Sequence, residues 1–200
     1  MVEVFNVGVV GAGYVGLATG ACLSHLGHEV VCVDEDEELI AGLEEGLIPF
    51  YEPGLEELVA RGAREDRLSF VAGPDGLAGL VGQMDVIFIA VGTPQAEDGS
   101  ADLSSVGAVA RRIGRALSEV GRGRERPLVV VNKSTVPVGS GDYVSTLIHE
   151  GLEEAGGESE GAGFLVVSNP EFLSEGSAIY DSLFPDRIVV GADSRGPSRP

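Results

Sequence analysis

Three glycines and one acid near the start of the chain have the types and the spacing to hold a phosphate-bearing ligand. Gly11, Gly13 and Gly16 stand in G-x-G-x-x-G register between an apolar, β-branched run and a stretch with helical spacing. Asp34 closes the next apolar run. Such glycines permit a tight turn, the close approach of a pyrophosphate and close helix–sheet packing, and the helix start offers N–H groups to phosphate. The pattern predicts a dinucleotide-binding βαβ unit.

The acid also indicates which dinucleotide is bound. The Asp34 carboxylate can accept hydrogen bonds from the hydroxyls of an adenosine ribose, whereas a 2′-phosphate would meet its negative charge. NAD is therefore favoured over NADP. The alternative is a βαβ unit without a nucleotide, because a chain with 30 Gly in 200 residues produces such spacings by chance. The strand before the motif, and the helix and acid after it, favour the nucleotide site.

Four further polar residues follow later apolar runs, where ligands sit in an open α/β sheet. Thr93 follows one run and is placed to touch the cofactor, with a simple turn as the alternative. Thr135 follows the next run. Glu171 and Glu175 follow a third and are four residues apart, so that on a helix both carboxylates would lie on one face. The runs cover residues 85–91, 128–131 and 164–168.

The alternation of apolar runs with helical spacing predicts an α/β fold. We expect a doubly wound, mostly parallel, Rossmann-like sheet of six or seven strands in the order 3-2-1-4-5-6, within a three-layer αβα arrangement. Residues 1–193 are expected to form the NAD-binding domain, and residues 194–200 a linker or disordered end. Residues 73–82 are predicted to be a loop with a helical turn, and residues 188–190 a final strand.

Charge and hydropathy restrict the partners. The chain has 32 Asp and Glu against 13 Lys and Arg, a formal net charge of −19, which argues against nucleic-acid binding and indicates a solvated acidic surface. No run approaches the ~18 apolar residues of a membrane span, and the N-terminus lacks the pattern of a signal peptide. We expect a globular, cytoplasmic protein with no membrane partner.

The cysteines and histidines are not expected to do chemistry. Cys22 and Cys32 fall in the predicted first helix and second strand, which favours small buried hydrophobic residues over metal ligands or a disulfide. We therefore predict no metal site. His25, His28 and His149 lie away from the predicted strand ends, so surface or packing roles are favoured over the site of a 2-hydroxy-acid dehydrogenase.

Six motifs, in order and with matching spacing over residues 2–191, resemble one known family. The chain is similar to the nucleotide-sugar dehydrogenases of the UDP-glucose and GDP-mannose 6-dehydrogenase type. The motifs are GAGYVG at Gly11, YEPGL at Tyr51, VGTP at Val91, KSTVPVG at Lys133, NPEFL with EG following at Asn169, and PDRIVVG at Pro185.

The resemblance implies an NAD-dependent, four-electron oxidation of a sugar C6 alcohol to a carboxylate, through an aldehyde and a cysteine-bound thioester. It matches Thr135 to the threonine that positions the attacking water, Glu171 to the glutamate assigned to thioester hydrolysis, and Glu175 to the glutamate near the nicotinamide. The motifs PDRIVVG and SAIYD favour UDP-glucose as the substrate, and a homodimer is expected only for a full-length protein. The residues that fall on the cofactor side are Gly11, Tyr14, Val15, Gly16, Asp34 and Thr93.

The chain also departs from the family pattern. The G-G-x-C-F-P-K-D segment that carries the nucleophilic cysteine is not among these residues, so we expect the chain to bind NAD without turning over substrate. Leu39 stands where members usually carry Lys or Arg, and Ser174 replaces a common arginine. Loss of the positive charge at Leu39 is expected to weaken NAD binding. A stand-alone NAD-binding or regulatory module and a fragment of a GDP-mannose-type dehydrogenase remain the alternatives.

Overall fold

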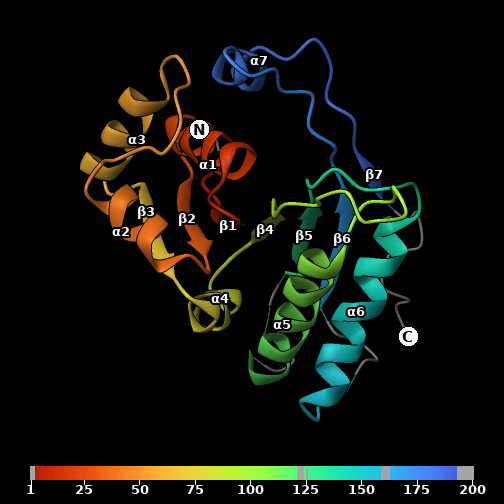
Figure 1. Cartoon of the computed structure of the whole chain (residues 1–200). Coiled ribbons are helices and arrows are strands. Elements are labelled where there is room, and N and C mark those ends of the chain that lie inside the picture. Colours follow the sequence, from red (N-terminus) through yellow and green to blue (C-terminus); the bar gives the residue numbers. More distant parts are fainter. Residues whose placement is uncertain (1–2, 121–123, 125, 159–162, 193–200) are drawn as a thin grey trace.

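A computed structural model of the chain describes residues 3–120, 124, 126–158 and 163–192 (Figure 1). Within them, seven strands form one sheet in the order β3-β2-β1-β4-β5-β6-β7. Strands β1 to β6 are parallel, and β7 pairs antiparallel with β6. The strands are β1 (Asn6–Val10), β2 (Glu29–Asp34), β3 (Leu68–Ala72), β4 (Val86–Ile89), β5 (Leu128–Asn132), β6 (Phe164–Ser168) and β7 (Gly191–Ala192).

The strand order confirms the predicted doubly wound sheet. Strand β1 lies between β2 and β4, with Val10 in register with Val33 on one side and Ile89 on the other. The chain order therefore reverses at β1, and an open α/β sheet binds ligands at the carboxyl ends of the strands beside such a reversal. The glycine turn that follows Val10 begins at this point.

Helices cover both faces of the sheet and make the predicted three layers (Figure 1). Val7 and Val9 of β1 belong to a core shared with helices α1 and α3, whereas Val10 belongs to a second core shared with α4, α5 and α6. Because both faces are buried, the strands read as nearly continuous apolar runs. The helices are α1 (Tyr14–His25), α2 (Glu37–Glu44), α3 (Leu55–Arg64), α4 (Pro74–Val81), α5 (Ser104–Val120), α6 (Ser140–Glu154) and α7 (Ala178–Leu183).

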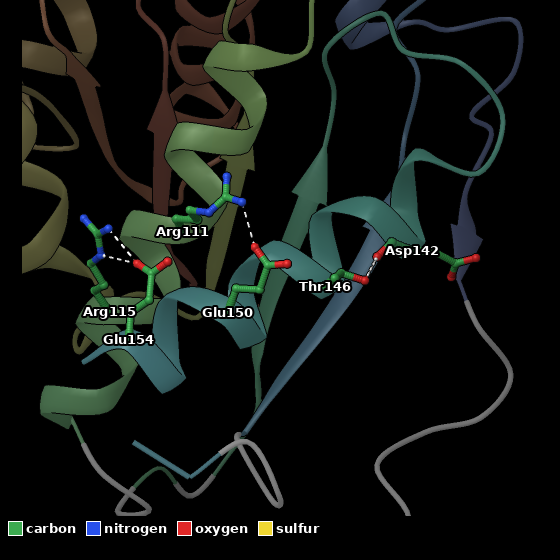
Figure 2. A network of polar contacts seen from close by, with 6 residues as sticks. All are labelled: Arg111, Arg115, Asp142, Thr146, Glu150 and Glu154. Carbon is green, nitrogen blue, oxygen red and sulfur yellow. Dashed lines mark hydrogen bonds and ion pairs between the residues drawn. The ribbon is translucent and has the colours of Figure 1, made fainter. Parts of the chain in front are cut away.

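Helices α5 and α6 approach each other at two glycines. A Cβ added to Gly114 would lie 2.0 Å from the carbonyl oxygen of Ile148, and one added to Gly151 would lie 2.1 Å from that of Arg111. Only glycine permits backbones to come this close. Two ion pairs, Arg111–Glu150 and Arg115–Glu154, join the same helices at their exposed rim, each with an N–O distance of 2.7 Å (Figure 2).

Two local predictions are wrong. Residues 73–82 contain a full helix, α4, in which Leu77 and Val81 are buried one turn apart. This apolar face stabilises the helix against the sheet. Residues 188–190 are not a strand, and pairing with β6 occurs at Gly191 and Ala192 instead. The reason is that the side-chain amide of Asn169 takes the carbonyl oxygen of Val189, at 2.9 Å, in place of a ladder partner.

Two further predictions concern membrane spans and the C-terminal residues. No helix among the described residues combines the length and the apolar character that a bilayer crossing requires. The predicted linker at residues 194–200 lies outside the described part of the chain.

Candidate functional site

The glycine turn between β1 and α1 has the backbone geometry that its sequence predicts. Gly11 has φ +99°, a left-handed conformation that favours glycine, and its N–H donates to the carbonyl of Val33 at 2.8 Å. A Cβ on Gly16 would lie 1.8 Å from the carbonyl oxygen of Gly11, so the helix can start against the turn only with glycine here. By contrast, a Cβ on Gly13 would meet no atom within 4 Å. The turn is tight on its protein side and open at Gly13.

Helix α1 begins at Tyr14, directly after Gly13, and no side chain caps it. Its first turn also contains no acidic residue. Tyr14 and Val15 are both half-buried at this start. The first N–H groups of a helix have no partner within the helix and carry its positive dipole end, so this uncapped start suits a pyrophosphate.

Asp34 lies beside the turn, at the end of β2. One oxygen of its carboxylate, Oδ2, accepts a hydrogen bond from the N–H of Ala12 at 2.6 Å, and Oδ1 accepts one from the N–H of Asp36 at 3.1 Å. The carboxylate therefore has a fixed orientation. Asp34 and Gly11 also line a cavity of about 200 Å³ with Val91 and Arg112. This cavity lies at the carboxyl end of β1, where the strand order reverses and where we predicted the nucleotide site.

The surroundings of Leu39 suit an apolar residue rather than a cation. Leu39 is half-buried and packs against the core shared by α1 and α3, so it acts as an apolar residue of α2. A cation does face the cavity from α5, on the other side. The Arg112 guanidinium lies 3.8 Å from the Glu35 carboxylate, with 37% of the Arg112 side chain exposed. A positive group therefore lies at the cavity that Asp34 also lines.

The loops after β4 and β5 bring two predicted site residues together. The Thr93 hydroxyl donates to the backbone carbonyl of Thr135 at 2.8 Å. Beside them, the hydroxyl of buried Ser134 donates to the carbonyl of Val91 at 2.7 Å. These bonds hold the two loops together at the carboxyl edge of the sheet. The side chain of Thr135 remains exposed, because its backbone rather than its hydroxyl makes the contact.

Glu171 and Glu175 do not share a helix face, so that expectation is wrong. Residues 169–174 have no regular structure, and α7 begins only at Ala178. The Glu171 carboxylate accepts a hydrogen bond from the N–H of Leu173 at 2.7 Å, and such a local side-chain bond competes with helix formation. Glu171 is half-buried and Glu175 exposed.

Lys133 lies beside the predicted site residues at the carboxyl edge of the sheet, and the sequence analysis assigned it no role. Its ammonium donates to Oδ1 of Asn169 at 3.3 Å, linking the ends of β5 and β6. Burial lowers the pKa of Lys133, and the nearby Glu171 carboxylate offsets this in part. The signal was present in the sequence, since a lysine directly follows the apolar run that forms β5.

Glu52 is a second residue to which the sequence analysis assigned no role. Only 4% of this residue is exposed, and its carboxylate accepts a hydrogen bond from the Tyr14 hydroxyl at 2.5 Å. Burial raises the pKa of Tyr14 to about 12, with help from this bond and from the negative charges of Glu52 and Glu175. Glu175 therefore lies close to the start of α1. Nothing in the spacing of the PFYEPGL turn marks its acid as buried, because its partners come from elsewhere in the chain.

The cysteines and two of the histidines have the packing roles that we predicted. Cys22 and Cys32 are free and buried, and burial raises the pKa of the two thiols to about 11 and 12. Such thiols are inert rather than nucleophilic. His149 packs on Phe164 with ring centroids 4.9 Å apart, and Nδ1 of His28 accepts a hydrogen bond from the N–H of Phe5.

Comparison with known proteins identifies the family of the chain. Residues 5–198 match the family model described as UDP-glucose/GDP-mannose dehydrogenase family, NAD binding domain. The UDP-glucose 6-dehydrogenase of Rhizobium meliloti is 50% identical over 189 residues, a match covering 94% of this chain and 39% of that protein. The chain thus spans about two fifths of the length of the curated relatives that it matches.

Solved structures give the same result. The UDP-glucose dehydrogenase of Pyrobaculum islandicum superposes with a TM-score of 0.84 at 44% identity, covering 96% of this chain and 41% of that one. A ternary complex of GDP-mannose dehydrogenase from Pseudomonas aeruginosa gives 0.82 at 38% identity, covering 93% and 40%. Together with the glycine turn and Asp34, these matches show that the chain belongs to the UDP-glucose/GDP-mannose dehydrogenase family and forms its NAD-binding domain.

Proposed function

We propose that this chain is the cofactor-binding part of an NAD-dependent UDP-glucose 6-dehydrogenase, which converts UDP-glucose to UDP-glucuronate. The observation that carries the proposal is the Asp34 carboxylate, fixed by the N–H of Ala12 at 2.6 Å beside an uncapped helix start. An acid in this position offers acceptors to ribose hydroxyls and repels a 2′-phosphate. The pyrophosphate of the cofactor would contact the turn at Gly13 and the N–H groups of Tyr14 and Val15.

The residues after β4, β5 and β6 would act on the substrate side. The C6 alcohol loses four electrons, which leave as two hydrides to two NAD molecules, and the carbon passes through an aldehyde and a cysteine-bound thioester. In this proposal Thr135 holds the water that hydrolyses the thioester, and Glu171 relays its proton. Thr93 fixes the backbone of Thr135 by a 2.8 Å hydrogen bond, which supports a set position for the water.

The nucleophilic cysteine would come from outside these 200 residues. Cys22 and Cys32 are buried away from solvent and have raised thiol pKa values, so neither is suited to attack an aldehyde. A fusion of the chain to the remaining part of the Rhizobium meliloti relative tests the substrate side. We expect two NADH for each UDP-glucuronate formed, and Thr135→Ala or Glu171→Gln should stop acid formation. Normal acid formation by these variants would exclude the two assigned roles.

UDP-glucose is preferred over GDP-mannose on the strength of the sequence relatives, which are named UDP-glucose 6-dehydrogenases. A GDP-mannose dehydrogenase nevertheless superposes almost as well, so the fold does not separate the two substrates. The same fusion, supplied with GDP-mannose in place of UDP-glucose, gives the test. Faster NADH formation with GDP-mannose would reverse the assignment.

Calorimetric titration with NAD, and with NADP as the control, tests the cofactor site directly. We expect saturable binding of NAD that is tighter than that of NADP, at both moderate and high salt. The second salt condition matters because an acidic protein repels an anionic ligand less when the charges are screened. Absence of NAD binding at both salt concentrations would contradict the proposal.

A stand-alone NAD-binding or regulatory module is the second candidate. The observation in its favour is Leu39, which fills an apolar position of α2 where a cation is usual in the family. The titration and the fusion separate the two candidates. Tight NAD binding by the chain, together with a fusion that makes no NADH from either sugar nucleotide, would favour the module.

A further inference from the structure

Glu52 joins three segments that are far apart in the sequence. Its Oε2 accepts hydrogen bonds from the Tyr14 hydroxyl at 2.5 Å and from the N–H of Gly176 at 2.7 Å. Its Oε1 accepts one from the N–H of Ala178 at 2.9 Å. The carboxylate therefore lies between the start of α1, its own loop between α2 and α3, and the turn that leads into α7.

The hydrogen bonds of Glu52 stabilise its charged form despite burial. Burial alone raises the pKa of Glu52, but the bonds from Tyr14, Gly176 and Ala178 outweigh burial and hold the pKa below its ordinary value. The group is thus a buried anion whose charge is satisfied by donors from two other segments. Separating either segment from Glu52 would leave part of a buried charge without partners, which is costly.

The two segments carry different parts of the site. Tyr14 is the first residue of α1, directly after the open position at Gly13. The other segment holds Glu175, which lies one residue before Gly176 and close enough to raise the pKa of Tyr14. We propose that Glu52 is a positioning residue, which connects the glycine turn to residues 174–178 so that NAD binding at the turn also orders Glu175. The proposal rests on the NAD site proposed above.

Hydrogen exchange with and without saturating NAD tests this connection. In the unaltered chain, NAD should slow exchange at the glycine turn and also at residues 174–178. In Glu52→Gln, the NH2 group of the new amide replaces one carboxylate oxygen and faces N–H or O–H donors, so at least one of the hydrogen bonds of Glu52 is lost. We expect NAD affinity to fall about tenfold, which corresponds to ~1.4 kcal/mol. At saturating NAD, protection should then be confined to the turn. A purely structural role would lower stability but leave NAD-dependent protection at both places.

Two more variants keep the test decisive. Tyr14→Phe removes only the phenolic donor and leaves the Glu52 carboxylate, so it should weaken the distant protection even if Glu52→Gln does not fold. Glu56→Gln, an exposed acid of α3, is the matched control and should behave as the unaltered chain. NAD-dependent protection of residues 174–178 that survives in Tyr14→Phe and Glu52→Gln would overturn the proposal. So would NAD binding that protects only the turn in the unaltered chain, whereas failure to bind NAD at all would overturn the proposed function as well.

Discussion

Two contacts between backbones that require glycine can be compared, one at the start of α1 and one between α5 and α6. An added methyl group would collide with a carbonyl oxygen at 1.8 Å at Gly16 and at 2.0 Å at Gly114. The surroundings differ. Beside Gly16 there is an uncapped helix start, open space at Gly13 and the fixed Asp34 carboxylate. Beside Gly114 there are buried apolar side chains and, at the rim, ion pairs (Figure 2).

This difference shows which part of a glycine pattern carries function. A close contact between backbones requires glycine whether or not a ligand is present, so Gly16 and Gly114 report packing. The start of α1 also has open space at Gly13, next to the first N–H groups of the helix and the fixed Asp34 carboxylate. The α5–α6 contact has no such arrangement among the described residues, so its glycines indicate packing alone. The two regions can therefore be separated by experiments that measure stability and NAD binding in the same variants.

The largest expected effect is on the α5–α6 contact. Gly114→Ala forces the helices apart, and we expect a loss of about 3 kcal/mol in the free energy of unfolding, the upper end for overpacked cores. For a chain of this size the melting temperature should fall by roughly 6–12 °C. Denaturant unfolding and calorimetric NAD titration measure both quantities, and NAD affinity should change less than about twofold. The control is Gly79→Ala, where an added Cβ meets nothing within 4 Å.

The opposite result is expected at Gly13. Gly13→Ala places a methyl group in space that no protein atom fills, so the free energy of unfolding should change only by what alanine costs at the start of a helix, about 1 kcal/mol or less. The methyl group would meet the pyrophosphate instead, and NAD affinity should fall at least about tenfold. Unchanged affinity would remove the distinction drawn between the two glycine contacts.

Asp34→Asn tests the acid that distinguishes the first region. Replacing the carboxylate weakens the bonds to the ribose and to the N–H of Ala12, and we expect a loss of about 1 kcal/mol in NAD binding. NADP binding should fall less or improve, because a 2′-phosphate is no longer repelled. Glu38→Gln removes the same charge from the same acidic run at an exposed position and should leave the NAD/NADP ratio unchanged.

The stability that Glu52 contributes near the start of α1 should depend on pH. The native pKa of Glu52 is lowered, so its contribution is full above the unfolded pKa of about 4.3 and is lost as pH falls through the lower native value. The stability difference between the unaltered chain and Glu52→Gln should therefore be constant from pH 7 to 5 and shrink below pH 4. A difference that grows on acidification would contradict the direction of the shift.

The smallest effect is expected at the rim of the α5–α6 contact. The side chains of Arg115 and Glu154 are 55% and 47% exposed, so their 2.7 Å ion pair is screened by water and salt. A double-mutant cycle with Arg115→Gln and Glu154→Gln should give a coupling of no more than about 0.5 kcal/mol, falling at high salt. A coupling above about 1 kcal/mol would mean that the rim, and not the glycine contact alone, joins these helices.

The sequence was sufficient for the sheet and for the first region because both depend on local order. Apolar runs mark the strands, and Gly11, Gly16 and Asp34 act within one βαβ unit. Two of the failures lie where side chains from distant segments decide the structure. Asn169 displaces strand pairing at Val189, and the buried carboxylate of Glu52 takes its donors from Tyr14, Gly176 and Ala178. No local pattern contains that information.

The bonds of Glu52 also set an order of events during synthesis. Glu52 and Ala178 are separated by 126 residues, which a ribosome working at about 5–20 residues per second adds in roughly 6–25 s. Until then the nascent βαβ unit holds a carboxylate whose buried position has no backbone donors, which favours a hydrated, unclosed loop between α2 and α3. The contact between Glu52 and residues 176–178 can therefore form only after α7 has been made, so we expect full NAD binding only from a chain synthesised through α7.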